Sequence, residues 1–161
     1  IVPNSVTSIG DSAFYGCENL TSITIPDSVT SIGSYAFDYC TGLNSITILG
    51  NIKNISSGTF RGCSSLNSIT IPEGVTSIGG DAFLNCSSLQ SIYIPSSVTN
   101  IQGRYAEPFE GCSPTLKIYT GVKEGKIPSG WRSYWNYYSE SGALSVTYGI
   151  TREEYETIIS G

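Results

Sequence analysis

Histidine and methionine are absent from this chain of 161 residues, and charged residues make up only 13% of it. Without histidine, neither a Ser-His nor a Cys-His nucleophile system can be assembled. The 13 Asp and Glu residues outnumber the 8 Lys and Arg residues, which argues against nucleic acid and against an anionic membrane as partners. Apolar runs are short, so we expect no membrane-inserted helix.

What the chain does contain is a repeat. Cys17, Cys40, Cys63 and Cys86 are each 23 positions apart, and the residues around them recur with the same period. The other recurring columns are Ile9, Ile32, Ile55, Ile78 and Ile101; Phe14, Phe37, Phe60 and Phe83; and Leu20, Leu43, Leu66 and Leu89. Self-similarity at a fixed period of this length is typical of a solenoid.

Each unit has the pattern of one coil of such a solenoid. The segment "SITI" alternates small polar residues with Ile, as expected of a strand with one buried face. A proline such as Pro26 then ends the strand. In "GxxAFxxC", the Phe and Cys are three residues apart, which predicts one turn of α or 3₁₀ helix. One coil cannot bury its apolar side alone, so successive coils must stack in parallel.

The cysteine column is best explained by packing. Cysteine is among the most buried residue types and behaves in a core as a small hydrophobic residue. Five cysteines leave one over after pairing, and neither a C-x-x-C motif nor a histidine ligand is present, which argues against a zinc site. A single disulfide between stacked neighbours or one reactive thiol are the alternatives. We therefore expect free, buried thiols and no metal or cofactor.

The repeated motif "IPxSVTSIGxxAFxxCxxLxSITI" closely resembles the BspA-type leucine-rich repeat over residues 1 to about 119. The resemblance implies a repeat solenoid with a parallel β-sheet on its concave face, short helical turns on its convex side and a C-terminal cap. It also implies a non-enzymatic binding or adhesion module that is extracellular or at the cell surface. No signal peptide is visible at the start of this chain, "IVPNSV".

These patterns predict three parts. Residues 1–119 form five repeats of about 23 residues, and residues 120–149 form a cap with an aromatic cluster and a closing strand, "SVTYG". Residues 150–161 form a terminal helix, which Thr151 and Glu154 start as a capping box. Ile1 falls in the middle of a unit, so we expect upstream repeats of the same chain.

The outward positions of the strands form the one surface that repeats with the coils. We expect them to bind a protein or glycan, most of all where Tyr replaces Thr, because interfaces favour Tyr and Arg. The predicted ligand-binding residues are Ser45, Thr47, Ser68, Thr70, Ser91, Tyr93, Tyr105, Lys117 and Tyr119. Trp131 and Trp135 in the cap are the alternative candidates for ligand binding. In the alternative without function, Ser and Thr are there only because they are soluble and suit strands.

Two functions of other classes stay open. A flat Ser-x-Thr ladder could bind ice or a crystalline polysaccharide, although the leucine-rich motif implies curvature. A β-helix enzyme that degrades polysaccharides would need clustered acidic residues on one face. Asp11, Asp27, Glu73 and Asp81 instead fall at the coil corners. The sequence therefore predicts no catalytic residue.

Overall fold

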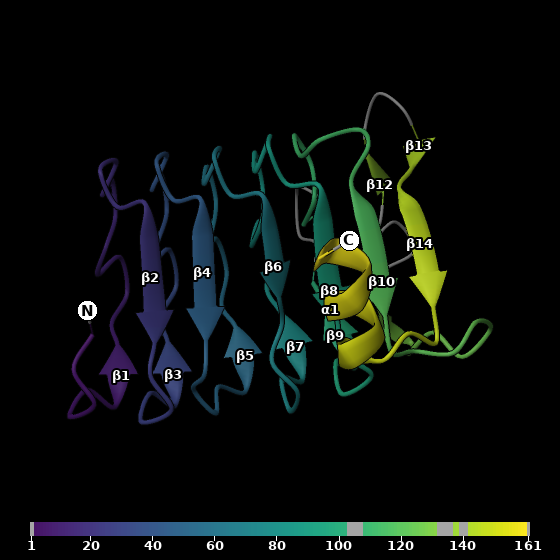
Figure 1. Cartoon of the computed structure of the whole chain (residues 1–161), viewed down its shortest axis with the longest axis horizontal. Helices are drawn as coiled ribbons and strands as arrows, with labels where there is room; N and C mark the ends of the chain where they lie inside the picture. Colours follow the sequence, from purple (N-terminus) through teal and green to yellow (C-terminus); the bar gives the residue numbers. More distant parts are fainter. Residues whose placement is uncertain (1, 103–107, 132–136, 139–141, 161) are drawn as a thin grey trace.

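Strands from successive repeats lie side by side along one side of the molecule in the computed structural model (Figure 1). The structure describes residues 2–102, 108–131, 137–138 and 142–160. The long strands are β2 (Ser22–Ile25), β4 (Ser45–Ile48), β6 (Ser68–Thr70), β8 (Ser91–Ile94), β10 (Lys117–Thr120) and β14 (Ser145–Tyr148). We call them the main sheet. Their ladders are parallel and join equivalent positions, such as Ser22 with Ser45. Between β4 and β6 the backbone N–H of Asn67 donates to the carbonyl of Asn44.

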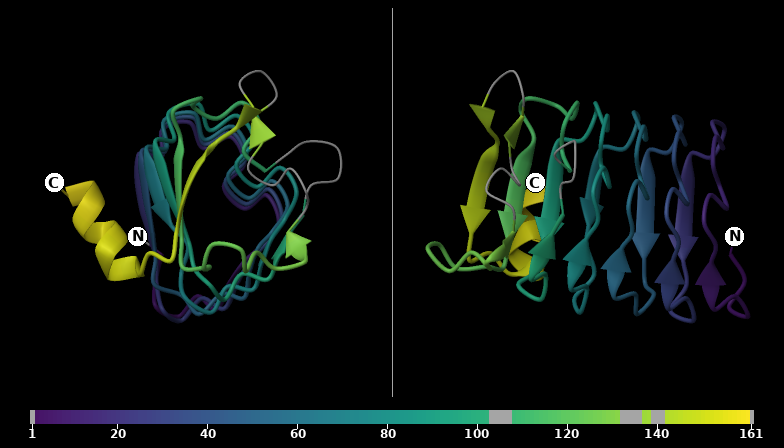
Figure 2. Two further views of the ribbon diagram at one scale, coloured as in Figure 1. Left: turned by 90° about the vertical axis from the view of Figure 1, so that its right-hand side faces the viewer. Right: turned by 180° about the vertical axis from the view of Figure 1, so that it is seen from behind.

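Short strands form a second parallel surface on another side of the coils. They are β1 (Ser8–Ile9), β3 (Ser31–Ile32), β5 (Asn54–Ile55), β7 (Ser77–Ile78), β9 (Asn100–Ile101) and β11 (Gly130–Trp131). Viewed along the stack, the coils superimpose on one another, and helix α1 (Arg152–Ser160) lies outside the main sheet (Figure 2). The predicted parallel solenoid of about five coils is confirmed.

Turns complete each coil on the side where the sequence predicts a helical turn. The N–H of Cys40 donates to the Phe37 carbonyl three residues earlier, as in a 3₁₀ turn. The N–H groups of Phe37 and Tyr39 instead donate to carbonyls of the next coil, at 2.9 and 2.8 Å. Because alternate N–H groups bond between coils, the segment is a series of turns, and the structure assigns no helix to it within the described residues.

The interior is built from columns of identical residues. The Phe column forms a continuous stack in which neighbouring ring centroids lie 5.0 to 5.7 Å apart and ring planes differ by 4° to 17°. Such aromatic pairs contribute about 0.5–1.5 kcal/mol each beyond the area that they bury. Each Cys thiol from Cys40 onward donates to a Phe carbonyl of the preceding coil; for Cys63 and Phe37 the distance is 3.1 Å.

All five cysteines lie within the described residues and are free thiols. Four of them are buried, while Cys17 in the first coil is half-buried. Burial raises the pKa of Cys63 far above its ordinary value and raises that of Cys40 to about 11. The protons of these two thiols are therefore retained at neutral pH and donated to Phe carbonyls, which suits the structural role expected from the sequence.

The two ends of the stack differ. At one end β14 extends the main sheet beyond β10, and β12 (Tyr137–Tyr138) pairs with β13 (Gly142–Ala143) antiparallel. At the other end Phe14, Leu20 and Ile23 are only half-buried. The division into 1–119, 120–149 and 150–161 stays a prediction. No helix among the described residues is long and apolar enough to cross a membrane.

Candidate binding site

The outer face of the main sheet, made of the outward side chains of its strands, changes along the stack. On β4 the predicted alternation holds, because Ser45 and Thr47 are exposed while Ile46 and Ile48 point inward and are buried. On β6, Ser68 and Thr70 are half-buried. The exposed Ser and Thr rows therefore lie on β2 and β4 at one end of the sheet and again on β14 at the other end.

Helix α1 covers the part of this face around Tyr93 and Tyr119 on β8 and β10. Tyr93 on β8 is 2% exposed and Tyr119 on β10 is 7% exposed, because Tyr155 of α1 packs against both. The hydroxyls of Tyr155 and Ser91 lie 3.0 Å apart and form a hydrogen bond. The two tyrosines expected to be the most favourable ligand contacts are thus occupied by the chain itself.

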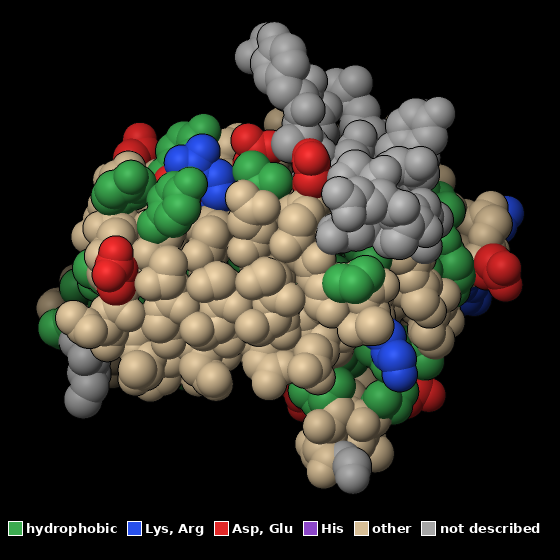
Figure 3. All heavy atoms as spheres, turned by 90° about the horizontal axis from the view of Figure 1, so that it is seen from above, with side chains coloured by type: hydrophobic (Ala, Val, Ile, Leu, Met, Phe, Trp, Pro, Cys, Tyr) green, Lys and Arg blue, Asp and Glu red, His purple; other side chains and the backbone are tan. Residues whose placement is uncertain are grey.

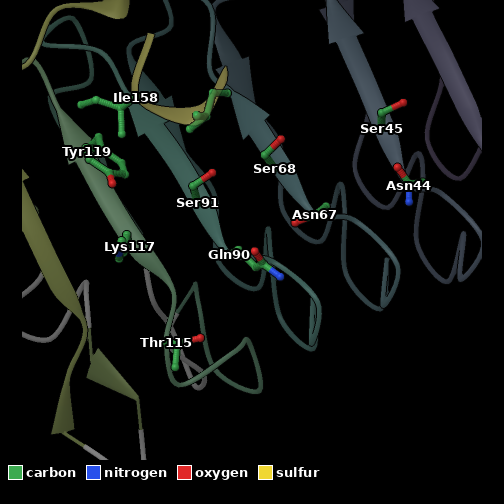
Figure 4. Close-up of a pocket in the computed structure, with 11 residues that line it drawn as sticks. Asn44, Ser45, Asn67, Ser68, Gln90, Ser91, Thr115, Lys117, Tyr119 and Ile158 are labelled. Atoms are coloured by element: carbon green, nitrogen blue, oxygen red, sulfur yellow. The ribbon is translucent and has the colours of Figure 1, made fainter. Parts of the chain in front are cut away.

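Between the open rows and α1 the surface forms a groove with a volume of about 590 Å³ (Figure 4). Its lining residues are Asn44, Ser45, Asn67, Ser68, Gln90, Ser91, Thr115, Lys117, Tyr119, Ile158 and Ile159. The close-up shows Ser45, Ser68 and Ser91 on successive strands and Ile158 near Tyr119. One wall is therefore a ladder of amides and hydroxyls, and the other is apolar.

The electrostatics of the groove are simple. Among the described residues that line it, Lys117 is the one that carries a charge. Side-chain amides both donate and accept hydrogen bonds, and hydroxyls do the same. The groove can therefore match a ligand with closely spaced donors and acceptors, while the half-exposed Ile158 and Ile159 contact an apolar part of it.

The pKa values of Tyr93 and Tyr155 are both raised. Burial, assisted by the nearby Glu73 carboxylate, raises the pKa of Tyr93 to about 12. The Tyr93 hydroxyl donates to Glu73 Oε1 at 3.1 Å. Burial likewise raises the pKa of Tyr155. Near neutral pH the phenols of Tyr93 and Tyr155 therefore carry no charge.

The remaining predicted residues lie apart from the groove or outside the described part of the chain. Tyr105 and Trp135 both fall outside the described residues. Trp131 is 5% exposed, and its indole N–H donates to the carbonyl of Val98 at 3.0 Å. That contact joins β11 to the preceding coil, which gives Trp131 a structural role in the cap.

A tyrosine and arginine cluster on the turns is a second surface to consider. In Figure 3, which looks down on the turns, hydrophobic and basic side chains gather toward the end of the stack with the first coils. Arg61 stacks on the rings of Tyr35 and Tyr39, 5.0 and 5.5 Å from their centroids, and binds the carboxylate of the buried Asp38 through two nitrogens. A buried carboxylate needs a charged partner. The ion pair with Asp38 therefore explains the presence of Arg61, and no ligand is needed to explain it.

Asn44, Asn67 and Gln90 were not among the residues predicted from the sequence. Asn44 and Asn67 immediately precede "SITI" segments and Gln90 precedes the equivalent "SIYI", so the three form a column that the alignment of repeats could have revealed. The capping box that starts α1 is present as predicted: the N–H of Glu154 donates to Thr151 Oγ1, and the N–H of Thr151 donates to the Glu154 carboxylate.

Metal binding finds no support in the part of the chain that the structure describes. No group of three or more Cys, Asp or Glu side chains there is arranged to hold a metal ion. The cysteine column is engaged with backbone carbonyls instead. What the site offers is therefore binding through hydrogen bonds and apolar contact.

Comparison with known families matches residues 1–115 to the model of the BspA type leucine rich repeat region. The chain belongs to the BspA-type leucine-rich repeat family. This confirms the resemblance found in the motif "IPxSVTSIGxxAFxxCxxLxSITI". A comparison with curated proteins finds no match.

Three solved structures are similar to this chain. A leucine rich cell surface protein from Faecalibacterium prausnitzii A2-165 shares 33% identity and a TM-score of 0.63, over 98% of this chain and 33% of that one. The T. pallidum leucine-rich repeat protein shares 25% identity and a TM-score of 0.63, over 96% and 76% of the two chains. A leucine-rich repeat protein from Eubacterium ventriosum ATCC 27560 shares 31% identity and a TM-score of 0.51, over 70% and 36%. This chain spans about one third of the F. prausnitzii protein.

Proposed function

We propose that this chain is a non-enzymatic binding module, secreted or at the cell surface, that binds a protein or glycan through the outer face of the main sheet. The groove between the amide and hydroxyl ladder and α1 is the observation that carries the proposal. The similar F. prausnitzii protein is named a leucine rich cell surface protein, which supports the proposed location at the cell surface.

The ladder suits an extended ligand. Equivalent side chains recur on neighbouring strands, which in a parallel sheet lie about 4.8 Å apart. Asn67 and Gln90 therefore offer amides at a regular spacing to a chain that crosses the strands. Both the hydroxyls of a glycan and the backbone of an extended peptide present donors and acceptors repeatedly along their length. Lys117 adds a cation for an acidic group on the ligand.

The test is binding of the purified chain to an array of neutral and acidic glycans and extracellular matrix proteins. We expect a ligand whose affinity falls at least about tenfold when Asn67→Ala and Gln90→Ala are combined, the loss of roughly 1.4 kcal/mol. Asn51→Ala is the matched control, because Asn51 is exposed in the turn after β4 and lies outside the groove. Equal affinity of the double variant and the wild type would mean that the ligand binds outside the groove.

The same experiment addresses catalysis. Glycans that bind are incubated with the chain and analysed for cleavage, and we expect intact glycans. Release of shorter products would favour the polysaccharide-degrading alternative instead of a binding module.

A further inference from the structure

Tyr155 fits into a socket on the main sheet that has three walls, which we define as Ser91, Tyr93 and Tyr119. The ring centroid of Tyr155 lies 5.6 Å from that of Tyr93, with the planes 26° apart, and 5.3 Å from that of Tyr119. Its hydroxyl meets that of Ser91 at 3.0 Å. Tyr155 is 0% exposed. The socket therefore matches both the ring and the hydroxyl of a tyrosine side chain.

The coils hold the socket in place without help from α1. Ser91 and Tyr93 belong to β8, which is hydrogen-bonded between β6 and β10. Tyr119 belongs to β10 and lies opposite Tyr93 in the parallel ladder. The Tyr93 hydroxyl is fixed by Glu73 in the preceding turn. These contacts lie within the solenoid and involve no residue of α1.

Helix α1, by contrast, is attached through Tyr155 and through Ile150, which directly precedes it and packs against the same aromatic cluster. Tyr155 is its buried residue, while Ile158 and Ile159 remain 49% and 44% exposed beside the groove. The helix is otherwise stabilised by its own groups, through the capping box and an ion pair between Arg152 and Glu156 at 2.7 Å. Detaching α1 would break the contacts of Tyr155 and Ile150 without opening a coil of the solenoid.

We propose that the socket is a recognition site for a tyrosine on a helix of a partner polypeptide, and that Tyr155 fills it in competition with that partner. The chemistry of the partner follows from α1, in which Ile158 and Ile159 follow Tyr155 by three and four residues and lie on the same side of the helix. Displacing α1 also takes Ile158 and Ile159 away from the groove, so the partner helix has to supply their apolar contacts. The inference extends the proposed function, since both use the outer face of the main sheet.

The experiment uses a fluorescent peptide with the sequence of residues 150–161 as the probe, titrated against the full chain and followed by anisotropy. The wild-type socket is already filled, so we expect Tyr155→Ala to bind the peptide at least tenfold more tightly than wild type. Adding Tyr119→Ala to that variant removes the gain. A peptide that carries Tyr155→Ala itself does not bind, and one that carries Tyr155→Phe binds more weakly because it cannot reach Ser91.

Circular dichroism and thermal melting check that each variant retains the solenoid, and Tyr155→Lys provides a second way to empty the socket. Equal affinity for wild type and both emptied variants would overturn the proposal, as would an absence of binding to folded Tyr155→Ala and Tyr155→Lys. The assay needs neither the array ligand nor Asn67 and Gln90, so its failure is distinguishable from failure of the groove as a binding site.

Discussion

Along β4 the inward Ile46 and Ile48 are 8% and 7% exposed, while Ser45 and Thr47 beside them face solvent. The inward positions stay almost constant from coil to coil, as the unbroken Phe stack shows. The outward positions change, from open Ser and Thr rows to tyrosines covered by α1. The difference indicates that stacking constrains the interior of each coil, whereas the residues of the outer face vary along the stack; it is on this face that we propose recognition.

The largest expected effect comes from the interior. Phe60 is 0% exposed and stacks between Phe37 and Phe83. Phe60→Ala should lower the free energy of unfolding by about 3–5 kcal/mol, through lost burial and the cavity that remains. Urea denaturation with circular dichroism measures it. A loss below about 1 kcal/mol would mean that the column is not the anchor of the stack.

Thiol labelling compares the reactivity of a cysteine in the interior of the stack with that of a cysteine in the first coil. Cys63 is buried, whereas Cys17 is half-buried. A disulfide reagent should modify Cys17 first and Cys63 slower than in denatured protein by a factor of about 10³ or more, since Cys63 reacts only after unfolding. Mass spectrometry of digested samples identifies each site. Rapid labelling of Cys63 in the native protein would contradict its burial.

Alkaline pH acts on both the interior and the covered part of the outer face. The pKa of Cys40 rises to about 11 and that of Tyr93 to about 12 in the folded state. Their contribution to stability is complete below the pKa values of the unfolded chain, near 9 for the thiol and 10 for the phenol, and is lost as pH rises through the folded values. We expect the melting temperature to fall between about pH 9 and 12.

The control for this pH dependence is Cys40→Ala, whose melting temperature should fall less steeply over the same range although its starting value is lower. An identical slope for wild type and the variant would exclude the thiol as a source of the effect.

The smallest effect is expected on the open rows of the outer face. Ser45→Ala should change the free energy of unfolding by less than about 0.5 kcal/mol, because the side chain is exposed and its methyl replacement suits a strand. The measurement is the same urea denaturation as for Phe60→Ala. A loss comparable with that of Phe60→Ala would mean that inward and outward positions are reversed.

The sequence predicts the stack because each coil repeats the same local rules. The 23-residue spacing of the Cys column and the alternation in "SITI" place Ile46 inward and Ser45 outward without knowledge of any distant contact. The turns differ in detail: an N–H such as that of Phe37 bonds to the next coil. Which carbonyl accepts from this N–H depends on the position of the neighbouring coil and not on the local sequence pattern.

The candidate site was harder to predict because α1 docks from far along the chain. Nothing in the local pattern of β8 states that Tyr155, more than 60 residues away, covers Tyr93. A signal did exist, since large aromatic residues at outward positions of a polar sheet require a cover or a partner. The prediction assigned these tyrosines to a partner, which stays a prediction, and overlooked the cover supplied by the chain.

The most direct measurement is chemical-shift mapping by NMR of the chain titrated with the tightest ligand from the arrays. If the ligand binds the outer face of the main sheet, we expect chemical-shift changes at the groove residues Asn44, Asn67, Gln90 and Lys117. Shifts confined to the turns around Tyr39, with the main sheet unchanged, would contradict the assignment of recognition to the outer face.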